Sequence, residues 1–395
     1  MKKTALSAAL LIFFLSFPLF AQSEAEQAYI KAITTPDISQ KVKLLKEYLQ
    51  KYEGKGTKYE NHVYAHLCLL PFQGKTPQQT IDYGEKALAL GGLDDLTKAQ
   101  VWIQLSGIYS QLGQNLEKAK SYAFQVVNLA KANKNKENET ESPQQWNQFI
   151  GAGYFAHAQA LEKADDLGEA VDSYINSYKI LKKAQIVQSL KKIGKSLYDQ
   201  KNYTDAEKAF KVACEVTKDF GSCAFYAKTL YRNGKKDEAL KYFKQAYAQQ
   251  KSGEIAYNIG IILAGKARSD PSLSEEAIKY LLDASFLSPK NSKKAMELAK
   301  NLFFVTNKDL NYNQKVEELS ERSKKLEELT ETFNQNFGDK AEEDLSDAEK
   351  KEMEKLLAEI EAEKKAIKKL EAEQQAALEK FNHLIEQTKK RLGIS

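Results

Sequence analysis

The sequence predicts an all-α protein in which an array of short helix pairs is followed by a long helical hairpin. Three observations predict this fold. Residues 187–289 contain one pattern of small and apolar residues three times, with Gly194 and Ala227 33 positions apart. Proline, which interrupts helices, occurs only 7 times in 395 residues. Beyond residue 311, apolar residues recur every seven positions, the period of helices that pack along their length.

Each copy of the pattern is expected to form two antiparallel helices that pack through small residues. The small residues of the two helices are, in order, Gly194, Ala227 and Gly260, then Ala206, Ala239 and Ala277. A small residue lets two helices approach closely, while larger residues three or four positions away fill the remaining space. The third copy carries an insertion at 266–274. Because one pair leaves an apolar face uncovered, successive pairs should stack.

This pattern resembles the tetratricopeptide repeat family, whose repeat is about 34 residues long. The resemblance covers most of residues 24–305. It implies an α-solenoid of about six to seven helix pairs that serves as a scaffold for binding other proteins or peptide segments. The repeat is a structural unit, so the resemblance does not name the partner.

The chain begins with Lys2 and Lys3, followed by an apolar run from Ala5 to Phe20 and a small residue at Ala21. These features predict a signal peptide at 1–21, and an uncleaved anchor is the alternative. The run is short for a membrane span of about 20 residues, so we expect no stable span after cleavage. We therefore expect an exported protein, located in a bacterial periplasm. The formal net charge of +5 includes Lys2 and Lys3, and the charge of about +3 left after cleavage is too small to indicate nucleic-acid binding.

The remaining chain is expected to divide into four parts. Residues 24–132 form N-terminal repeats, and 133–146 is a polar loop. Residues 147–305 form further repeats closed by a capping helix, and 311–392 forms the hairpin or coiled coil.

The long C-terminal helix is expected to start at a capping box made by Ser346 and Glu349 and to run to about Arg391. It could fold back on residues 311–337 or pair with another chain, and we expect the hairpin together with some self-association. Glu363 interrupts the apolar stripe and argues against a strict dimer.

No phosphate-binding loop, nucleophile elbow, zinc-protease motif or dinucleotide fingerprint occurs in the sequence. We therefore predict a non-enzymatic protein without a cofactor. His62 and His66 are spaced as two ligands on one helix could be, but Cys68 points elsewhere and no third ligand is evident. We interpret the histidines as packing or groove residues and predict no metal site.

Cys214 lies near the end of one helix, and Cys223 lies in the first turn of the next. Some cysteine-linked relatives of the repeat family look similar here, and an oxidising compartment would allow a disulfide. The alternative is that the two cysteines are small buried apolar residues. Cys68 is expected to be an unpaired, buried thiol.

The resemblance also implies a partner-binding groove on the concave face, formed by positions of the first helix that flank the small residue. Mapped onto this chain, these positions are Lys191, Lys195, Tyr198, Lys228, Tyr231, Arg232, Tyr257 and Asn258. Cations could pair with a carboxylate, and tyrosines add contact area. The set resembles the family's carboxylate clamp, although Lys195 stands where asparagine is expected. The alternative is a solvated basic face on which tyrosines pack locally.

The leading hypothesis is therefore an exported scaffold or adaptor that binds protein partners through this concave face. The alternative is a structural envelope assembly factor that acts mainly through its C-terminal coiled coil.

Overall fold

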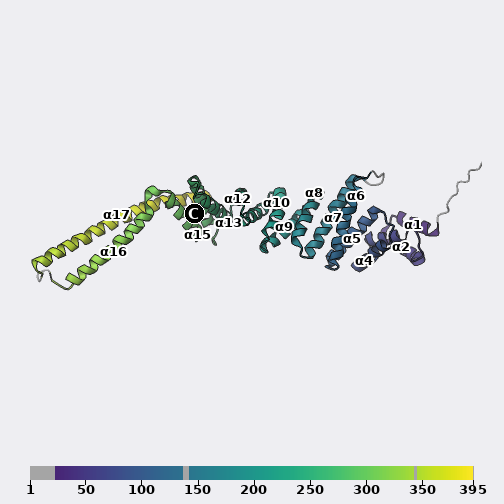
Figure 1. The fold of residues 1–395 in the computed structure, drawn as a ribbon, viewed down its shortest axis with the longest axis horizontal. Coiled ribbons are helices and arrows are strands. Elements are labelled where there is room, and N and C mark those ends of the chain that lie inside the picture. The colour runs from purple at the N-terminus through teal and green to yellow at the C-terminus, as the bar shows by residue number, and fades with distance from the viewer. Residues whose placement is uncertain (1–22, 137–141, 342–344, 395) are drawn as a thin grey trace, which may run out of the picture. The chain divides into compact units, whose positions relative to one another are not determined.

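The computed structural model describes residues 23–136, 142–341 and 345–394, and every regular element within these ranges is a helix (Figure 1). The chain divides into two compact units, Met1–Ile186 and Val187–Ser395, with the division inside helix α9 (Ala184–Asp199). The predicted signal peptide at 1–21 lies outside the described residues. Among those that are described, no helix is both long and apolar enough to cross a bilayer.

The first unit contains four consecutive helix pairs. They are α1 (Glu24–Thr34) with α2 (Ile38–Tyr52), α3 (Glu60–Leu69) with α4 (Pro77–Leu90), α5 (Asp95–Leu112) with α6 (Leu116–Asn133), and α7 (Pro143–Lys163) with α8 (Leu167–Leu181). The first helices of neighbouring pairs also contact one another: α3 packs against α5, and α5 packs against α7. A continuous face of first helices results, as expected for stacked repeats.

Local sequence signals set the helix boundaries in this unit. Thr76 and Gln79 form a capping box in front of α4, and Ser142 caps α7 with Pro143 in its first turn. Gly113 ends α5 with a left-handed backbone at φ 65°, which glycine adopts without steric cost. Since α6 reaches Asn133 and α7 begins at Pro143, both helices extend into the segment 133–146 that was predicted as loop.

The second unit contains further helix pairs. Its elements are the end of α9, then α10 (Tyr203–Thr217), α11 (Phe220–Arg232), α12 (Lys236–Gln249), α13 (Gly253–Lys266), η1 (Pro271–Leu273), α14 (Ser274–Leu287), α15 (Ser292–Thr306) and η2 (Lys308–Leu310). The short turn η1 accounts for the insertion predicted between the helices of the third repeat.

The small residues pack as predicted. A Cβ atom added at Gly194 would lie 3.1 Å from the Ala209 Cβ, and one at Gly260 would lie 2.7 Å from the Leu281 Cγ. Ala206, Ala239 and Ala277 are fully buried. The prediction that small residues let paired helices approach closely is therefore confirmed, and with it the predicted all-α array.

Beyond the array, α16 (Tyr312–Phe337) and α17 (Asp347–Leu392) pack against each other as a hairpin (Figure 1). The capping box of Ser346 and Glu349 is present at the start of α17. Glu363, which interrupts the apolar stripe, is 7% exposed and accepts hydrogen bonds from Arg322 (3.0 Å) and Lys325 (2.8 Å) of α16. The carboxylate that interrupts the apolar stripe therefore has its hydrogen-bond partners within the hairpin.

The end of α17 returns to the last helices of the array. Phe381 packs against Phe303 and Phe304, with ring centroids 5.4 and 6.2 Å apart. Near the end of α17, Arg391 forms an ion pair with Asp283 of α14. In addition to α15, the C-terminal helix thus covers apolar surface at the end of the array.

Candidate functional site

The eight residues predicted to form a groove lie on the first helices of three successive pairs. Lys191, Lys195 and Tyr198 are on α9, Lys228, Tyr231 and Arg232 are on α11, and Tyr257 and Asn258 are on α13. Their contacts within the chain determine what each side chain could still offer to a partner.

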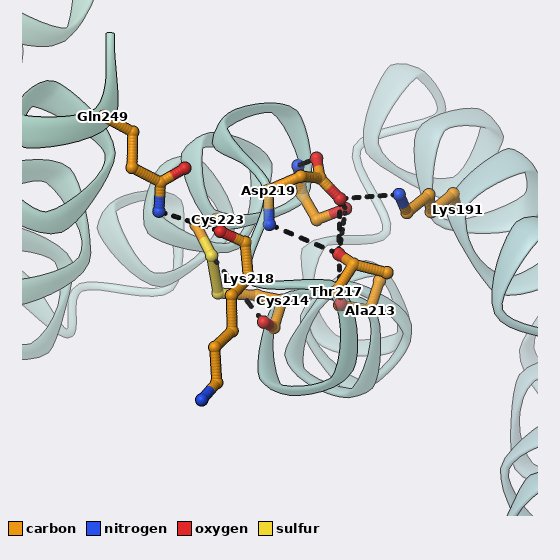
Figure 2. Close-up of polar contacts among 9 residues, drawn as sticks. Lys191, Ala213, Cys214, Thr217, Lys218, Asp219, Cys223 and Gln249 are labelled. Carbon is orange, nitrogen blue, oxygen red and sulfur yellow. Dashed lines mark hydrogen bonds and ion pairs between the residues drawn. A yellow bond between two sulfur atoms is a disulfide. The ribbon is translucent and has the colours of Figure 1, made fainter. Parts of the chain in front are cut away.

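Lys191 binds the turn between α10 and α11 (Figure 2). Its Nζ lies 2.7 Å from the Asp219 Oδ2, and Asp219 is the N-cap of α11, where it accepts a hydrogen bond from the Ser222 amide. Burial opposes ionisation of Asp219, but hydrogen bonds from Lys191, Thr217 and Ser222 hold its pKa well below the usual value. The charge of Lys191 is therefore matched within the chain.

Two further lysines also have acidic neighbours. The Lys195 Nζ lies 3.0 Å from the Asp199 Oδ2, one turn along the same helix. The Lys228 Nζ lies 2.9 Å from the Glu254 Oε1 on α13 and over the Phe225 ring. Three of the four predicted cations are thus paired with carboxylates of this chain.

The other members of the set pack locally. Tyr198 meets Tyr203 and Phe225 edge to ring, and its hydroxyl interacts with Arg232 and raises the pKa of that guanidinium. Tyr257 packs against the apolar cluster of α14, α15 and α17. Asn258 donates to the Glu254 carbonyl oxygen, at 3.0 Å. These contacts favour the alternative of a basic face with locally packed tyrosines over a carboxylate clamp.

Cys214 and Cys223 form a disulfide across the α10–α11 turn, with 4.7 Å between their Cα atoms (Figure 2). This separation is below the limit of about 7 Å for a bridge. Gln249 of α12 donates to the Lys218 carbonyl oxygen of the same turn, at 2.8 Å. The turn is therefore held by the disulfide, by Lys191 from α9 and by Gln249 from α12.

We expect replacement of both cysteines by alanine to lower the free energy of unfolding by about 2–3 kcal/mol. The physical reason is the greater chain entropy of the unfolded state when a loop with a sequence separation of 9 is opened. Urea denaturation without reductant would measure the change. Adding reductant should destabilise the wild-type protein by a similar amount and leave the variant unchanged; equal stability of wild type and variant would contradict the prediction.

The two histidines near the N-terminus do not converge on a common point with Cys68. His62 contacts the Asn61 Oδ1 at 2.7 Å and the Asp94 Oδ2 at 3.5 Å, whereas the His66 Nε2 lies 3.3 Å from the Tyr29 hydroxyl. Burial raises the pKa of the Cys68 thiol to about 12. Within the described part of the chain, no three potential ligands are grouped as a metal site would require.

A hollow that the sequence analysis did not identify lies on the face of first helices in the first unit. Its volume is about 420 Å³, and it is lined by α5, α7 and the segment 181–186. The apolar lining consists of Ile103, Ile108, Ala152, Phe155, Ala156, Leu181 and Ile186. The polar lining consists of Gln104, Gln111, Gln159, Gln185 and Lys183, with Gly107 between them.

Unlike most of the charged side chains of the predicted groove, the polar side chains of this hollow are not paired with other residues of the described chain. In the described ranges, none of the four glutamine carboxamides forms a hydrogen bond with another residue of the chain, and Lys183 has no acidic neighbour within ion-pair distance. A Cβ atom added at Gly107 would meet nothing within 4 Å, so the helix surface there is open. The same mapping that selected residues of α9, α11 and α13, applied to α5 and α7, could have found these positions.

One repeat of the chain matches a known protein family. Residues 188–219 match the family model described as tetratricopeptide repeat. This segment covers most of α9, all of α10 and the turn after it. It contains Cys214 of the disulfide and the close contact of Gly194 with Ala209. Residues 188–219 are therefore a tetratricopeptide repeat.

Three solved structures are similar to this chain. One is a tetratricopeptide repeat protein from Parabacteroides merdae, 14% identical, with a TM-score of 0.34 and coverage of 70% of this chain and 99% of that chain. The apo form of RapI is 14% identical, with a TM-score of 0.32 and coverage of 84% and 99%. The complex of the TPR2AB domain of yeast Sti1 with pHSP90 is 13% identical, with a TM-score of 0.25 and coverage of 63% of this chain and 99% of that chain. No curated protein sequence matches the chain.

Tetratricopeptide repeats stack into extended surfaces that bind other polypeptides. Residues 188–219 are therefore a unit of the kind that builds such surfaces.

Proposed function

We propose that this protein is an exported, non-enzymatic adaptor that holds a segment of another protein on the face of first helices in its first unit. The hollow between α5 and α7 carries this proposal, because it combines apolar surface with polar side chains that have no partner in the described chain. Export is proposed from the basic and apolar N-terminal sequence alone.

The residues around the hollow support binding rather than catalysis. The lining contains no serine, cysteine, histidine, aspartate or glutamate, and Lys183, its one group of a kind that can attack a substrate or transfer a proton, is exposed. Carboxamides and aliphatic side chains are suited to holding a polypeptide, since they combine hydrogen bonding with apolar contact.

The C-terminal hairpin is proposed to be an arm of this adaptor. The alternative assembly function would need the apolar stripe of α17 for another chain, but Phe381 and Ala377 are already buried against α14 and α15. Deleting 306–395 would expose that cluster and remove Arg391, the cation paired with Asp283. Such a deletion would therefore test folding as well as partner binding.

A photo-reactive amino acid at position 107 would test the proposed binding face. The open space at Gly107 accommodates a side chain, and the residue lies inside the hollow. We expect illumination in the producing cell to give a covalent adduct with a specific protein at position 107. The matched control is position 128, an exposed residue of the second helix α6.

Adducts at position 107 and not at 128 would support the proposal. The same adducts at both positions, or none at 107 in folded protein, would refute it.

A further inference from the structure

We infer that a cavity in the second unit, lined by α14, α15 and α17, binds a small uncharged amphipathic molecule that carries a hydroxyl or carbonyl group. Its volume is about 880 Å³. Small-molecule sites in proteins have volumes of about 300–1,000 Å³. The lining residues belong neither to the first unit nor to α9, α11 and α13 of the predicted groove. The site is therefore independent of the binding face proposed above.

One buried hydroxyl in the lining has no hydrogen-bond partner. Ser274 is the first residue of α14 and is 5% exposed, and its Oγ forms no hydrogen bond within the described part of the chain. A buried polar group that stays unbonded costs free energy, because it has given up its hydrogen bonds to water. A serine hydroxyl both donates and accepts, so a hydroxyl or carbonyl oxygen of a bound molecule is a suitable partner.

The buried part of the lining is mainly hydrocarbon and carries no charge. Its members are Ile278, Leu282, Phe303, Ser274 and Thr388. Half-buried Leu384 adds further apolar surface. An aliphatic or aromatic body placed against these residues would be removed from water, and this would provide most of the affinity.

The charges around the cavity favour an uncharged ligand. Of the four charged lining residues, Glu276 lies 2.8 Å from Lys244, and Arg391 is paired with the buried carboxylate of α14. The other two are Glu275 and Lys279, which are exposed, opposite in sign and without an ion-pair partner in the described ranges. A charged ligand would lose hydration on entering and would gain little from one solvated counter-charge.

A molecule in this cavity would contact α17 as well as the array. Thr388 and Arg391 line it from α17, while Ser274 and Leu282 line it from α14. Because a ligand stabilises the state that binds it, occupancy should hold the end of α17 more firmly against α14.

The test uses the purified full chain and probes that share one eight-carbon chain: 1-octanol, octanoate and octylammonium. In an NMR titration at neutral pH we expect saturable binding of 1-octanol and about tenfold weaker binding of both charged probes. Shortening the alcohol to 1-hexanol should also weaken binding about tenfold, because two fewer methylene groups are buried. Bound 1-octanol should slow hydrogen exchange in α14 and at the end of α17.

Two serine variants test the recognition group. Ser274→Ala should weaken 1-octanol binding about fivefold without lowering the stability of the free protein, since this hydroxyl makes no hydrogen bond in the described chain. Ser272→Ala is the matched control, because the Ser272 hydroxyl is exposed and already donates to the Asp270 Oδ1 at 2.6 Å. This control should leave the affinity unchanged.

Equal affinity of the wild type and Ser274→Ala would overturn the role of the buried hydroxyl. Octanoate or octylammonium bound as tightly as 1-octanol would refute the uncharged ligand class. Absence of saturable binding to the folded protein, or slower exchange only outside α14 and α17, would refute the site itself. These outcomes are separate from the adducts expected at position 107, so either proposal can fail without the other.

Discussion

Replacing Arg391 with alanine is expected to lower the free energy of unfolding by about 3 kcal/mol, because it leaves a buried carboxylate without its cation. Asp283 on α14 is fully buried and accepts a hydrogen bond from Arg391 at 3.0 Å and another from the Tyr247 hydroxyl at 2.8 Å. Since Arg391 itself is partly exposed, the effect should be at the lower end of the range for buried pairs. Thermal unfolding of the full chain would measure the loss.

Two variants make this prediction specific. Lys390→Ala removes an exposed charge one residue away and should change stability by less than about 0.5 kcal/mol. The triple variant Asp283→Leu/Arg391→Met/Tyr247→Phe removes both charges and the Tyr247 hydroxyl that donates to Asp283. It should recover most of the loss, since an apolar group can replace a buried ion pair when no buried donor is left unpaired. Equal effects of Arg391→Ala and Lys390→Ala would show that the ion pair does not stabilise the end of the array.

The contact between Asp283 and Arg391 also marks the limit of what the sequence could predict. The two residues are 108 positions apart, and neither belongs to a repeating pattern. The helix pairs could be predicted, because Gly194, Ala227 and their equivalents recur at fixed spacing and each pair is local in sequence. The return of α17 to the array depends on packing between distant segments, which periodicity does not encode.

The candidate site shows the same limit. Family spacing placed Lys191 and Lys228 on the first helices α9 and α11, but it could not show that Asp219 and Glu254 lie within reach of them. In the hairpin, Glu363 was recognised as an interruption of the stripe, while its partners Arg322 and Lys325 became evident only from the fold. A charge predicted to face a partner must therefore be checked against acidic residues of neighbouring repeats.

The close approach of paired helices leads to the second large expected effect. Gly260→Leu should lower the free energy of unfolding by about 3 kcal/mol, the upper end of the range for overpacking. A Cβ atom at this position would lie 2.7 Å from the Leu281 Cγ and 3.2 Å from the Leu281 backbone nitrogen. To remove this steric overlap, α14 would have to move relative to α13. The cost of that movement should exceed the roughly 1 kcal/mol of helix propensity that leucine gains over glycine.

Gly265→Leu is the matched control, because it makes the same chemical change in the same helix. A Cβ atom at Gly265 would meet nothing within 4 Å, so this variant should be neutral or more stable by up to about 1 kcal/mol. Chemical denaturation would compare the two variants, and hydrogen exchange should show faster exchange of α14 amides in Gly260→Leu alone. Similar stability of both variants would mean that the repeat tolerates a large residue where its small residue stands, and that close helix approach does not hold the pairs together.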